Sequence, residues 1–414
     1  MANLSVDGTR LNRTLLELSA FGKNAEGGVD RVAYSDYDRD ARGYAMGLMN
    51  QAGLSVSVDA AGNVVGKRTG SDNNLRPIVT GSHIDTVLNG GNFDGCLGAM
   101  SAIEVAQTLK DGNLTTKHPL EFIIFQNEEQ GLFGSRAIAS GLQSAQLDLV
   151  SPSGKTIREG INFLGGDTNR LHEVIRAPGS IAAFVELHIE QGPILDLASK
   201  NIGVVTGIVA VYRWNVVVKG IANHAGTTPM NARKDALVAA AEFIVAVNRV
   251  VTSHSGDQVG TVGKIAALPG AVNVIPGEVQ LTLELRDLEA AKVQQLYQEI
   301  TLAAGQIETS RGVTFQFTVA TQQQPAITSQ LIRETTVQVC ADLGRSYQMI
   351  QSGAGHDSQE MGRLGPMGMI FIPSVGGISH SPHEFSRPSD ITNGGNALLH
   401  VLLKLDQVLI DTKR

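Results

Sequence analysis

The sequence predicts an α/β protein with a mixed, mainly parallel sheet and an inserted α+β domain. In the first half of the chain, strand-like runs alternate with helical runs of about 10–15 residues, which is typical of parallel βαβ units. Between residues 212 and 327 the predicted order changes to β-α-β-β-α-β, the ferredoxin-like motif. The α/β pattern resumes after Pro325. We therefore expect a main domain in two parts, 1–211 and 328–414, with an inserted domain at 212–327.

The main domain is expected to begin with helices and to continue with strands that end in polar loops. Amphipathic runs within residues 7–53 predict the helices, and an apolar run that begins at Ile78 predicts a buried strand. The other elements predicted before the insertion are strands at 54–58, 63–67, 120–125 and 182–192 and a helix at about 98–110. After the insertion we expect helices near 329–343 and 392–409 and a strand at 368–373.

The inserted domain is predicted from a second set of strands and helices. Its strands are expected at 214–221, 259–267, 279–286 and 313–319, and its helices at about 234–250 and 288–307. Each helix connects two strands, as the split βαβ motif requires.

Composition and charge exclude several classes of protein. With 414 residues the chain exceeds the roughly 250–300 residues at which single cores stop growing. The net charge of -7 argues against nucleic acid or an anionic membrane as the main partner. The N-terminal residues lack the apolar core of a signal peptide, and no run reaches the roughly 20 apolar residues of a membrane span. Only Cys96 and Cys340 occur, so we expect no disulfide framework and a cytoplasmic location.

A histidine and two aspartates lie in the loop that follows the strand beginning at Ile78. The stretch GSHIDTVLNGGNFDG carries His83, Asp85 and Asp94 among glycines and asparagines, which suit tight turns. In open α/β sheets, ligands bind in the crevice outside the carboxyl ends of the strands. Taken alone, the stretch fits either a metal site or a polar turn. Asp85 could accept the ring N–H of His83 or could simply cap the turn.

Other histidines and carboxylates follow other predicted strands, namely Glu128, Glu129, His188 and His380. Imidazole and carboxylate groups suit zinc, manganese, cobalt or nickel. Five such ligands, one of them a bridging carboxylate, would hold two divalent ions about 3.5–4 Å apart. Because the adjacent side chains at 128 and 129 point in different directions, one could bind metal while the other acts as a general base. A paired-glutamate surface turn is the other interpretation.

Eight motifs in order resemble one family. They are GSHIDT, NGGNFDG, the Glu128-Glu129 pair, ELHIEQG, NHAGTTPM, NVIPG, SGAGHDS and GISHSP. The set is similar to the amidase branch of the dinuclear-zinc aminoacylase and carboxypeptidase superfamily. Within that branch it most resembles N-carbamoyl-L-amino acid hydrolases, with allantoate amidohydrolases and beta-ureidopropionases as siblings. The resemblance implies a zinc-peptidase-like main domain with an inserted lid and dimerisation domain.

The resemblance also implies a role for individual residues. The implied metal ligands are His83, Asp94, Glu129, His188 and His380, with Asp94 bridging two ions. Glu128 matches the general base. The positions that match residues holding the substrate's carboxylate are Gln191, Asn273 and Arg286, and the loop Gly353, Ala354 and Gly355 matches a segment beside the substrate. His224 matches a histidine that stabilises the developing oxyanion, in the family often from the other subunit. Without the resemblance, His224 would equally fit a capping or surface role.

The resemblance implies hydrolysis of the carbamoyl (ureido) C–N bond of a small carboxylate-bearing substrate. Water activated by the metals would attack, with Glu128 as general base, in a homodimer formed through residues 212–327. The segment EEQGLFGSR is shorter than in many carbamoylases, which changes part of the pocket wall. The substrate therefore stays open between N-carbamoyl-L-amino acids, allantoate and ureidopropionate. An N-acyl-amino acid hydrolase or dipeptidase would use the same metals, and a relative that only binds ligand is a third hypothesis.

Overall fold

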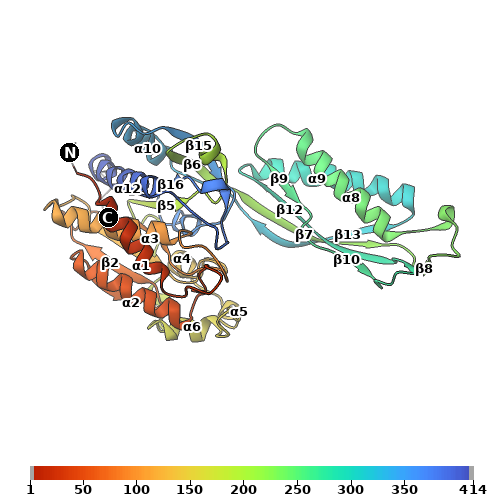
Figure 1. Cartoon of the computed structure of the whole chain (residues 1–414), viewed down its shortest axis with the longest axis horizontal. Coiled ribbons are helices and arrows are strands. Elements are labelled where there is room, and N and C mark those ends of the chain that lie inside the picture. The colour runs from red at the N-terminus through yellow and green to blue at the C-terminus, as the bar shows by residue number, and fades with distance from the viewer. Residues whose placement is uncertain (1–3, 410–414) are drawn as a thin grey trace. The chain divides into compact units, whose positions relative to one another are not determined.

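The computed structural model describes residues 4–409, which divide into two compact units (Figure 1). The first unit joins the residues up to Thr206 to those from Thr328 onward, and the second unit is Gly207–Ile327. The predicted inserted domain, 212–327, lies within the second unit.

A mixed sheet forms the centre of the first unit. Its strands are β1 (Ser55–Val58), β2 (Val64–Arg68), β3 (Ile78–His83), β4 (Leu120–Phe125), β5 (Ala183–Ile189), β6 (Ile202–Ile208), β15 (Tyr347–Ser352) and β16 (Met367–Ile372). They lie in the order β1-β2-β4-β3-β5-β16-β6, with β15 beside β6. The central strands β4, β3, β5 and β16 are parallel, whereas β1, β2 and β6 pair antiparallel. The predicted α/β class is therefore confirmed.

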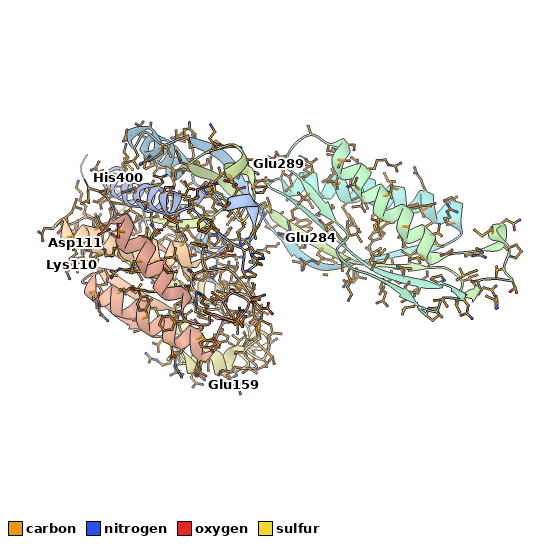
Figure 2. The ribbon with its side chains drawn as sticks, viewed as in Figure 1. Lys110, Asp111, Glu159, Glu284, Glu289 and His400 are labelled. Atoms are coloured by element: carbon orange, nitrogen blue, oxygen red, sulfur yellow. The ribbon has the colours of Figure 1, made fainter. Side chains whose placement is uncertain are left out.

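Helices cover both faces of this sheet. They are α1 (Gly8–Ser19), α2 (Asp36–Gln51), α3 (Cys96–Asp111), α4 (Phe133–Ala139), α5 (Ser144–Leu147), α6 (Ile157–Phe163), α7 (Ile194–Leu197), α10 (Gln330–Asp342), α11 (Asp357–Met361) and α12 (Pro388–Val408). On one face, α3 and α12 contact β5, and α1, α2 and α10 pack around them. On the other face, α11 contacts β5 and β16, and α4 packs beside α11. Lys110, near the end of α3, donates a hydrogen bond to the carbonyl of Gln51, the last residue of α2 (Figure 2).

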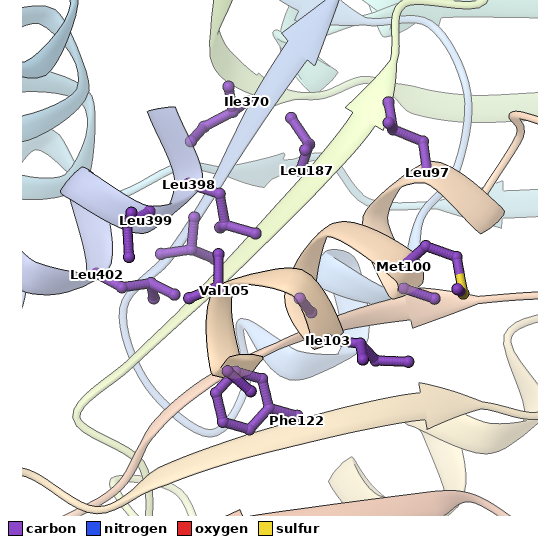
Figure 3. Packing of buried hydrophobic residues seen from close by; sticks show 14 of the residues in the cluster. Leu97, Met100, Ile103, Val105, Phe122, Leu187, Ile370, Leu398, Leu399 and Leu402 are labelled. Atoms are coloured by element: carbon purple, nitrogen blue, oxygen red, sulfur yellow. The ribbon is translucent and has the colours of Figure 1, made fainter. Parts of the chain in front are cut away.

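The central parallel strands are buried along their whole length, which explains why they appear in the sequence as continuous apolar runs. Figure 3 shows side chains of α3 and α12 packed against β4, β5 and β16. The residues labelled there include Leu97, Met100, Ile103, Val105, Phe122, Leu187, Ile370, Leu398, Leu399 and Leu402. The helix α3 approaches β5 so closely that a Cβ on Gly98 would lie 2.1 Å from the carbonyl oxygen of Leu187. This packing fixes the start of α3, and with it the loop that carries Asp94.

The second unit is a β-α-β-β-α-β arrangement with a five-stranded sheet. Its elements are β7 (Ala210–Lys219), β8 (Asn223–His224), α8 (Ala236–Ser253), β9 (Val259–Thr261), β10 (Ile265–Leu268), β11 (Val274–Ile275), β12 (Glu278–Asp287), α9 (Ala290–Arg311), β13 (Thr314–Gln323) and β14 (Ala326–Ile327). The sheet order is β10-β12-β7-β13, with β9 also on β12. α8 is long and apolar enough to cross a membrane by length and composition, but its buried side chains belong to the core of this unit.

Three of the differences from the predicted elements concern the sheets and the closing helix. The strand predicted at 259–267 is two strands, β9 and β10, because the pairing with β12 shifts by one residue between Thr261 and Ile265, which is a β-bulge. The closing helix α12 begins at Pro388 rather than at residue 392, since proline is well suited to the first turn of a helix. The strands β6 and β15 were not predicted, because two glycines interrupt the apolar run of β6 and polar residues interrupt that of β15.

Candidate metal centre

The carboxyl ends of four parallel strands bring the predicted metal ligands together. His83 is the last residue of β3, and His188 is the next-to-last residue of β5. Glu129 lies in the loop after β4, and His380 in the loop after β16. Asp94 lies immediately before α3. Because these strands are parallel, the five side chains lie along one edge of the sheet.

Asp94 is shared by two groups of possible metal ligands. Its Oδ1 lies 3.1 Å from His188 Nε2 and 3.9 Å from His83 Nε2. Its Oδ2 lies 3.1 Å from His380 Nε2, which is itself 3.4 Å from Glu129 Oε2. Within each group, one donor atom per residue lies within 4.8 Å of the others. A carboxylate with one oxygen toward each group is the arrangement that a bridging ligand needs.

Main-chain carbonyls set the tautomers of the two buried histidines. His83 Nδ1 lies 3.0 Å from the carbonyl oxygen of Asp85, and His188 Nδ1 lies 2.9 Å from that of Ile189. A carbonyl can only accept, so Nδ1 carries the proton in both rings. Nε2 of each ring therefore faces Asp94, and in the neutral ring it offers the lone pair that metal coordination requires.

Gly95 allows the loop to approach His83. Its φ of 62° lies in the left-handed region, and a Cβ at this position would lie 2.2 Å from His83 Nε2. Its N–H donates to His188 Nε2 at 3.0 Å. The motif NFDG therefore needs glycine after Asp94, so that Asp94 can lie between the two rings.

Uncompensated carboxylates surround these histidines. Burial, followed by the negative charges of Asp357 and Glu129, raises the pKa of Glu128 well above its ordinary value. Burial and Asp94 likewise raise the pKa of Glu129. Burial would raise the pKa of Asp94 too, but the nearby rings of His188 and His380 lower it. A buried set of carboxylates and imidazoles is stabilised by cations, so these residues fit divalent metal ions.

Asp85 contacts the glutamate pair rather than the ring that it was expected to hold. Its two carboxylate oxygens each accept a main-chain N–H at 3.3 Å, one from Glu128 and one from Glu129. Its Oδ1 is 3.7 Å from His83 Nδ1, farther than the carbonyl oxygen of Asp85 itself. The suggested hydrogen bond from the His83 ring to this carboxylate is therefore corrected: the ring is held by the carbonyl, and the carboxylate supports the loop after β4.

Glu128 and Gln191 lie beside the metal ligands. Glu128 Oε2 is 3.6 Å from His83 Nε2, on the side of the ring where a metal would bind. Gln191, at a φ of 60°, donates its side-chain amide to Asp94 Oδ2 at 2.7 Å. The predicted substrate-binding amide is thus held on the shared carboxylate in this structure.

The predicted loop Gly353, Ala354 and Gly355 follows β15 and leads into His356. Ser352 Oγ lies 2.8 Å from His356 Nε2 and donates to the carbonyl of Ala354. The His356 ring is 4.5 Å from the His188 ring, edge to face. This stacking places the end of the loop beside one of the candidate metal ligands.

The remaining predicted residues, His224, Asn273 and Arg286, lie in the second unit. β8 pairs with β11, so the N–H of Ala225 donates to the carbonyl of Asn273. His224 Nδ1 accepts N–H groups from Gly226 and Thr227, which leaves the proton of the neutral ring on Nε2. His224 is exposed and offers this N–H as a donor. Arg286 Nε donates to Glu284 Oε1 at 2.8 Å.

Sequence reasoning missed Glu384 and Ser379. Glu384 Oε1 accepts the main-chain N–H groups of Phe93 and Asp94 at 2.8 and 3.1 Å. Ser379 Oγ lies 3.0 Å from Asp94 Oδ2 and 2.8 Å from Glu384 Oε2. These bonds join the loop of Asp94 to the loop of His380. The only signal in the sequence was a glutamate four residues after His380.

Comparisons with known proteins show the family to which the chain belongs. Residues 79–404 match peptidase family M20/M25/M40. An N-carbamoyl-L-amino acid amidohydrolase from Geobacillus stearothermophilus is 37% identical over 407 residues, with 97% of this chain and 99% of that protein covered. A ureidoglycolate hydrolase from Arabidopsis thaliana is 39% identical over 417 residues, with 98% and 88% covered.

Solved structures show the same relationship. The crystal structure of an amidase of the hydantoinase/carbamoylase family from Burkholderia multivorans matches with a TM-score of 0.90 and 33% identity, and 97% of this chain and 98% of that chain are covered. The resemblance predicted from the eight motifs is confirmed. The chain belongs to peptidase family M20/M25/M40.

Proposed function

We propose that this chain is a metal-dependent amidohydrolase that cleaves the ureido C–N bond of an N-carbamoyl-L-amino acid or a related ureido acid. The observation that carries the proposal is Asp94, whose two oxygens face separate groups of candidate ligands while Glu128 lies 3.6 Å from His83. The names of the similar N-carbamoyl-L-amino acid amidohydrolase and ureidoglycolate hydrolase support the substrate class.

Two divalent ions would be held by the five residues predicted for them. These are His83, Asp94, Glu129, His188 and His380, with Asp94 shared. Zinc is the expected metal, and manganese, cobalt or nickel would suit the same donors. When bound, such ions polarise a carbonyl oxygen and lower the pKa of water to near neutrality.

The protein's own residues would then move the proton and orient the substrate. Glu128 would take the proton of the attacking water and deliver it to the leaving nitrogen, because its carboxylate lies 3.6 Å from His83 Nε2, on the side where a metal would bind. Water adds to the carbamoyl carbon and the bond to the amino nitrogen breaks. This cleavage gives the amino acid and carbamic acid, and carbamic acid then loses its own C–N bond to give ammonia and carbon dioxide. Asp85 would hold the loop of Glu128 through its two hydrogen bonds.

Residues other than the metal ligands would complete the substrate site. Arg286 would bind the substrate's carboxylate, since a guanidinium group can pair with it bidentately. Gln191 and Asn273 would add amide contacts, and the Gly353–Gly355 loop would line the substrate. His224 would donate its Nε2–H to the oxyanion that develops on the carbamoyl carbon.

The location and partners of the protein are also part of the proposal. Both cysteines are buried and unpaired, which supports a reducing, cytoplasmic environment. We propose a homodimer formed through the second unit, with a small ureido acid as the ligand and neither nucleic acid nor membrane as a partner.

A substrate panel tests this function. Protein loaded with each of the four metals should be assayed with N-carbamoyl-L-amino acids, allantoate, ureidoglycolate, ureidopropionate, N-acyl-amino acids and dipeptides. We expect metal-dependent release of ammonia from at least one ureido acid and far slower cleavage of the acyl and peptide substrates. Faster cleavage of a dipeptide or acyl-amino acid would contradict the proposal, as would turnover by protein shown to contain no metal.

A further inference from the structure

Two arginines and one glutamate form a cluster on one face of the second unit's sheet. Residues of a strand alternate between the two faces, and in β7 and β12 the buried residues face the helices. Arg213 of β7 pairs directly across from Glu284 of β12, and Arg286 lies two residues farther along β12 on the same face. Glu284 is labelled in Figure 2. The strand register therefore dictates that these three side chains meet.

Glu284 uses one oxygen for each arginine. Its Oε1 accepts from Nε and Nη2 of Arg286, both at 2.8 Å. Its Oε2 accepts from Nε of Arg213 at 2.9 Å and also from Nη2 of that residue. The Glu284 side chain is 20% exposed and that of Arg286 is 27% exposed, so water screens these bonds less than it screens a fully exposed pair.

The cluster keeps a net positive charge. Burial raises the pKa of Glu284, but the hydrogen bonds from Arg286 and Arg213 outweigh burial and lower it. The carboxylate is therefore ionised at neutral pH, and two guanidinium groups face one negative charge. A single further anion would balance this cluster.

We propose that Glu284 and Arg213 are positioning residues that hold Arg286 in the orientation needed to bind the carboxylate of the substrate. This inference rests on the proposed function, in which Arg286 binds that carboxylate. A flexible arginine loses rotamer freedom when it binds a ligand, and a guanidinium that is already held in place loses less. Arg213 shares the charge of Glu284, so one carboxylate holds Arg286 without cancelling the charge of both guanidinium groups. The cluster would therefore select ureido acids over neutral ureido compounds.

Other roles for Glu284 give different results. If the cluster were an ordinary surface ion pair, removing one member would change little, because such pairs contribute almost nothing measurable. If Glu284 competed with the substrate for Arg286, removing its charge would improve binding. If Glu284 positions Arg286, removing its charge should instead weaken the binding of carboxylate substrates and leave the binding of neutral substrates unchanged.

The test compares variants of the cluster with a matched pair elsewhere on the same unit. Glu284→Gln and Arg213→Gln would be compared with Glu242→Gln, which breaks the exposed pair in which Arg311 likewise donates to Glu242 through Nε and Nη2. Each metal-loaded protein would be assayed for kcat and KM with an N-carbamoyl amino acid and with its amide analogue, in which a carboxamide replaces the carboxylate. Arg213→Lys would test whether a positive charge at position 213, without the guanidinium group, is enough to keep Arg286 in position.

The expected result is a change in KM without a change in kcat. For the carboxylate substrate, Glu284→Gln should raise KM about tenfold, the effect of one lost charge-assisted hydrogen bond. Arg213→Gln should raise KM less, and Arg213→Lys should bring it back toward the parent value. For the amide analogue, and for Glu242→Gln with both substrates, KM should match that of the parent.

Two outcomes would overturn the inference, and they differ in what else they overturn. An unchanged or lowered KM for the carboxylate substrate in Glu284→Gln, with the parent active, would overturn the positioning role alone. A metal-loaded parent that hydrolyses no ureido acid would overturn the proposed function and this inference with it. Thermal unfolding of each variant would be measured, and a KM increase in a variant that unfolds at the parent temperature would support positioning.

Discussion

Single residues decide whether this edge of the sheet can hold metal. Asp94 reaches both groups of candidate ligands because Gly95 lets the chain pass His83 without a side chain in the way. The carbonyls of Asp85 and Ile189 hold both imidazole rings in the tautomer that presents Nε2. The site is therefore organised by main-chain contacts as much as by the five ligands.

Glu128→Gln should separate metal binding from proton transfer. The amide is nearly the same size as the carboxylate but cannot take the proton of the attacking water. We expect a loss of about 10²–10⁴-fold in kcat, the usual size of general acid–base assistance. Metal content, measured by elemental analysis, should stay near that of the parent. A variant whose rate lies within a factor of two of the parent, in a step limited by chemistry, would remove Glu128 from this role.

Gly95→Ala should destroy the metal centre without unfolding the protein. The added methyl group would lie 2.2 Å from His83 Nε2, and the φ of 62° disfavours any side chain. We expect loss of bound metal and of activity, measured together. The control is Gly43→Ala on α2, where a Cβ meets nothing within 4 Å and alanine favours the helix. Full metal content in Gly95→Ala would show that the loop can move away from His83.

At this scale the sequence predicted which candidate ligands lie together better than it predicted their hydrogen bonds. His83, Asp94, Glu129, His188 and His380 could be found because each follows a recognisable strand or glycine turn. Glu384 could not be found, because it supports Asp94 through main-chain N–H groups and follows no strand. The hydrogen bonds of Asp85 were equally hidden, since they depend on how two loops meet rather than on spacing.

The loops that carry the candidate ligands are held in place by contacts between helices and strands. The end of β4 is held by α2, where the buried side chain of Arg42 donates to the carbonyl of Phe125 at 2.9 Å and to Asp38 Oδ1 at 2.8 Å. Asp38 in turn accepts the N–H of Tyr34 at 2.8 Å. The position of Glu128 therefore depends on a helix nearly ninety residues earlier in the chain.

Arg42→Ala should destabilise the first unit strongly. Removing the guanidinium leaves Asp38 buried and unpaired, a change that typically costs about 3–5 kcal/mol. Chemical denaturation should show a lower free energy of unfolding. The matched control is Arg39→Ala on the same helix, which breaks exposed pairs with Asp36 and Asp40 and should leave the midpoint nearly unchanged. Equal effects of the two substitutions would contradict a structural role for the buried pair.

Strands and helices were predictable where an apolar pattern in the sequence is bounded by residues typical of turns. The buried strands β3, β4 and β5 appear in the sequence as apolar runs that end in polar loops. The bulge between β9 and β10 was not predictable, because a one-residue shift in pairing leaves no mark in a short alternating pattern. The strands β6 and β15 were missed because glycines in IGVVTGI and polar residues in YQMIQS weaken the apolar pattern of a strand.

At the scale of the whole molecule, the second unit offers surfaces suited to a second copy of the chain. β13 lies at one end of the five-stranded sheet order and is ten residues long, and long edge strands readily pair with another chain. α8 exposes the apolar side chains of Leu237, Val238 and Val245, the last of them 67% exposed. These features support the proposed homodimer. They also raise the question of which subunit supplies His224 to each active site.

Mixing two inactive variants tests whether His224 acts across the dimer. His224→Ala and Glu128→Gln should each lower turnover while keeping metal. If His224 acts on the partner's site, a hybrid dimer contains one site with both residues intact and one with neither. Random exchange of equal amounts makes half of the dimers hybrid, so about one quarter of all sites should recover in an isologous dimer. The control mixes Glu128→Gln with a variant that carries both His224→Ala and Glu128→Gln. This mixture should recover no activity, because no site then contains both Glu128 and His224. Subunit exchange confirmed by mass spectrometry without recovered activity would refute action in trans, since every hybrid site would then lack either the base or the histidine of its own chain.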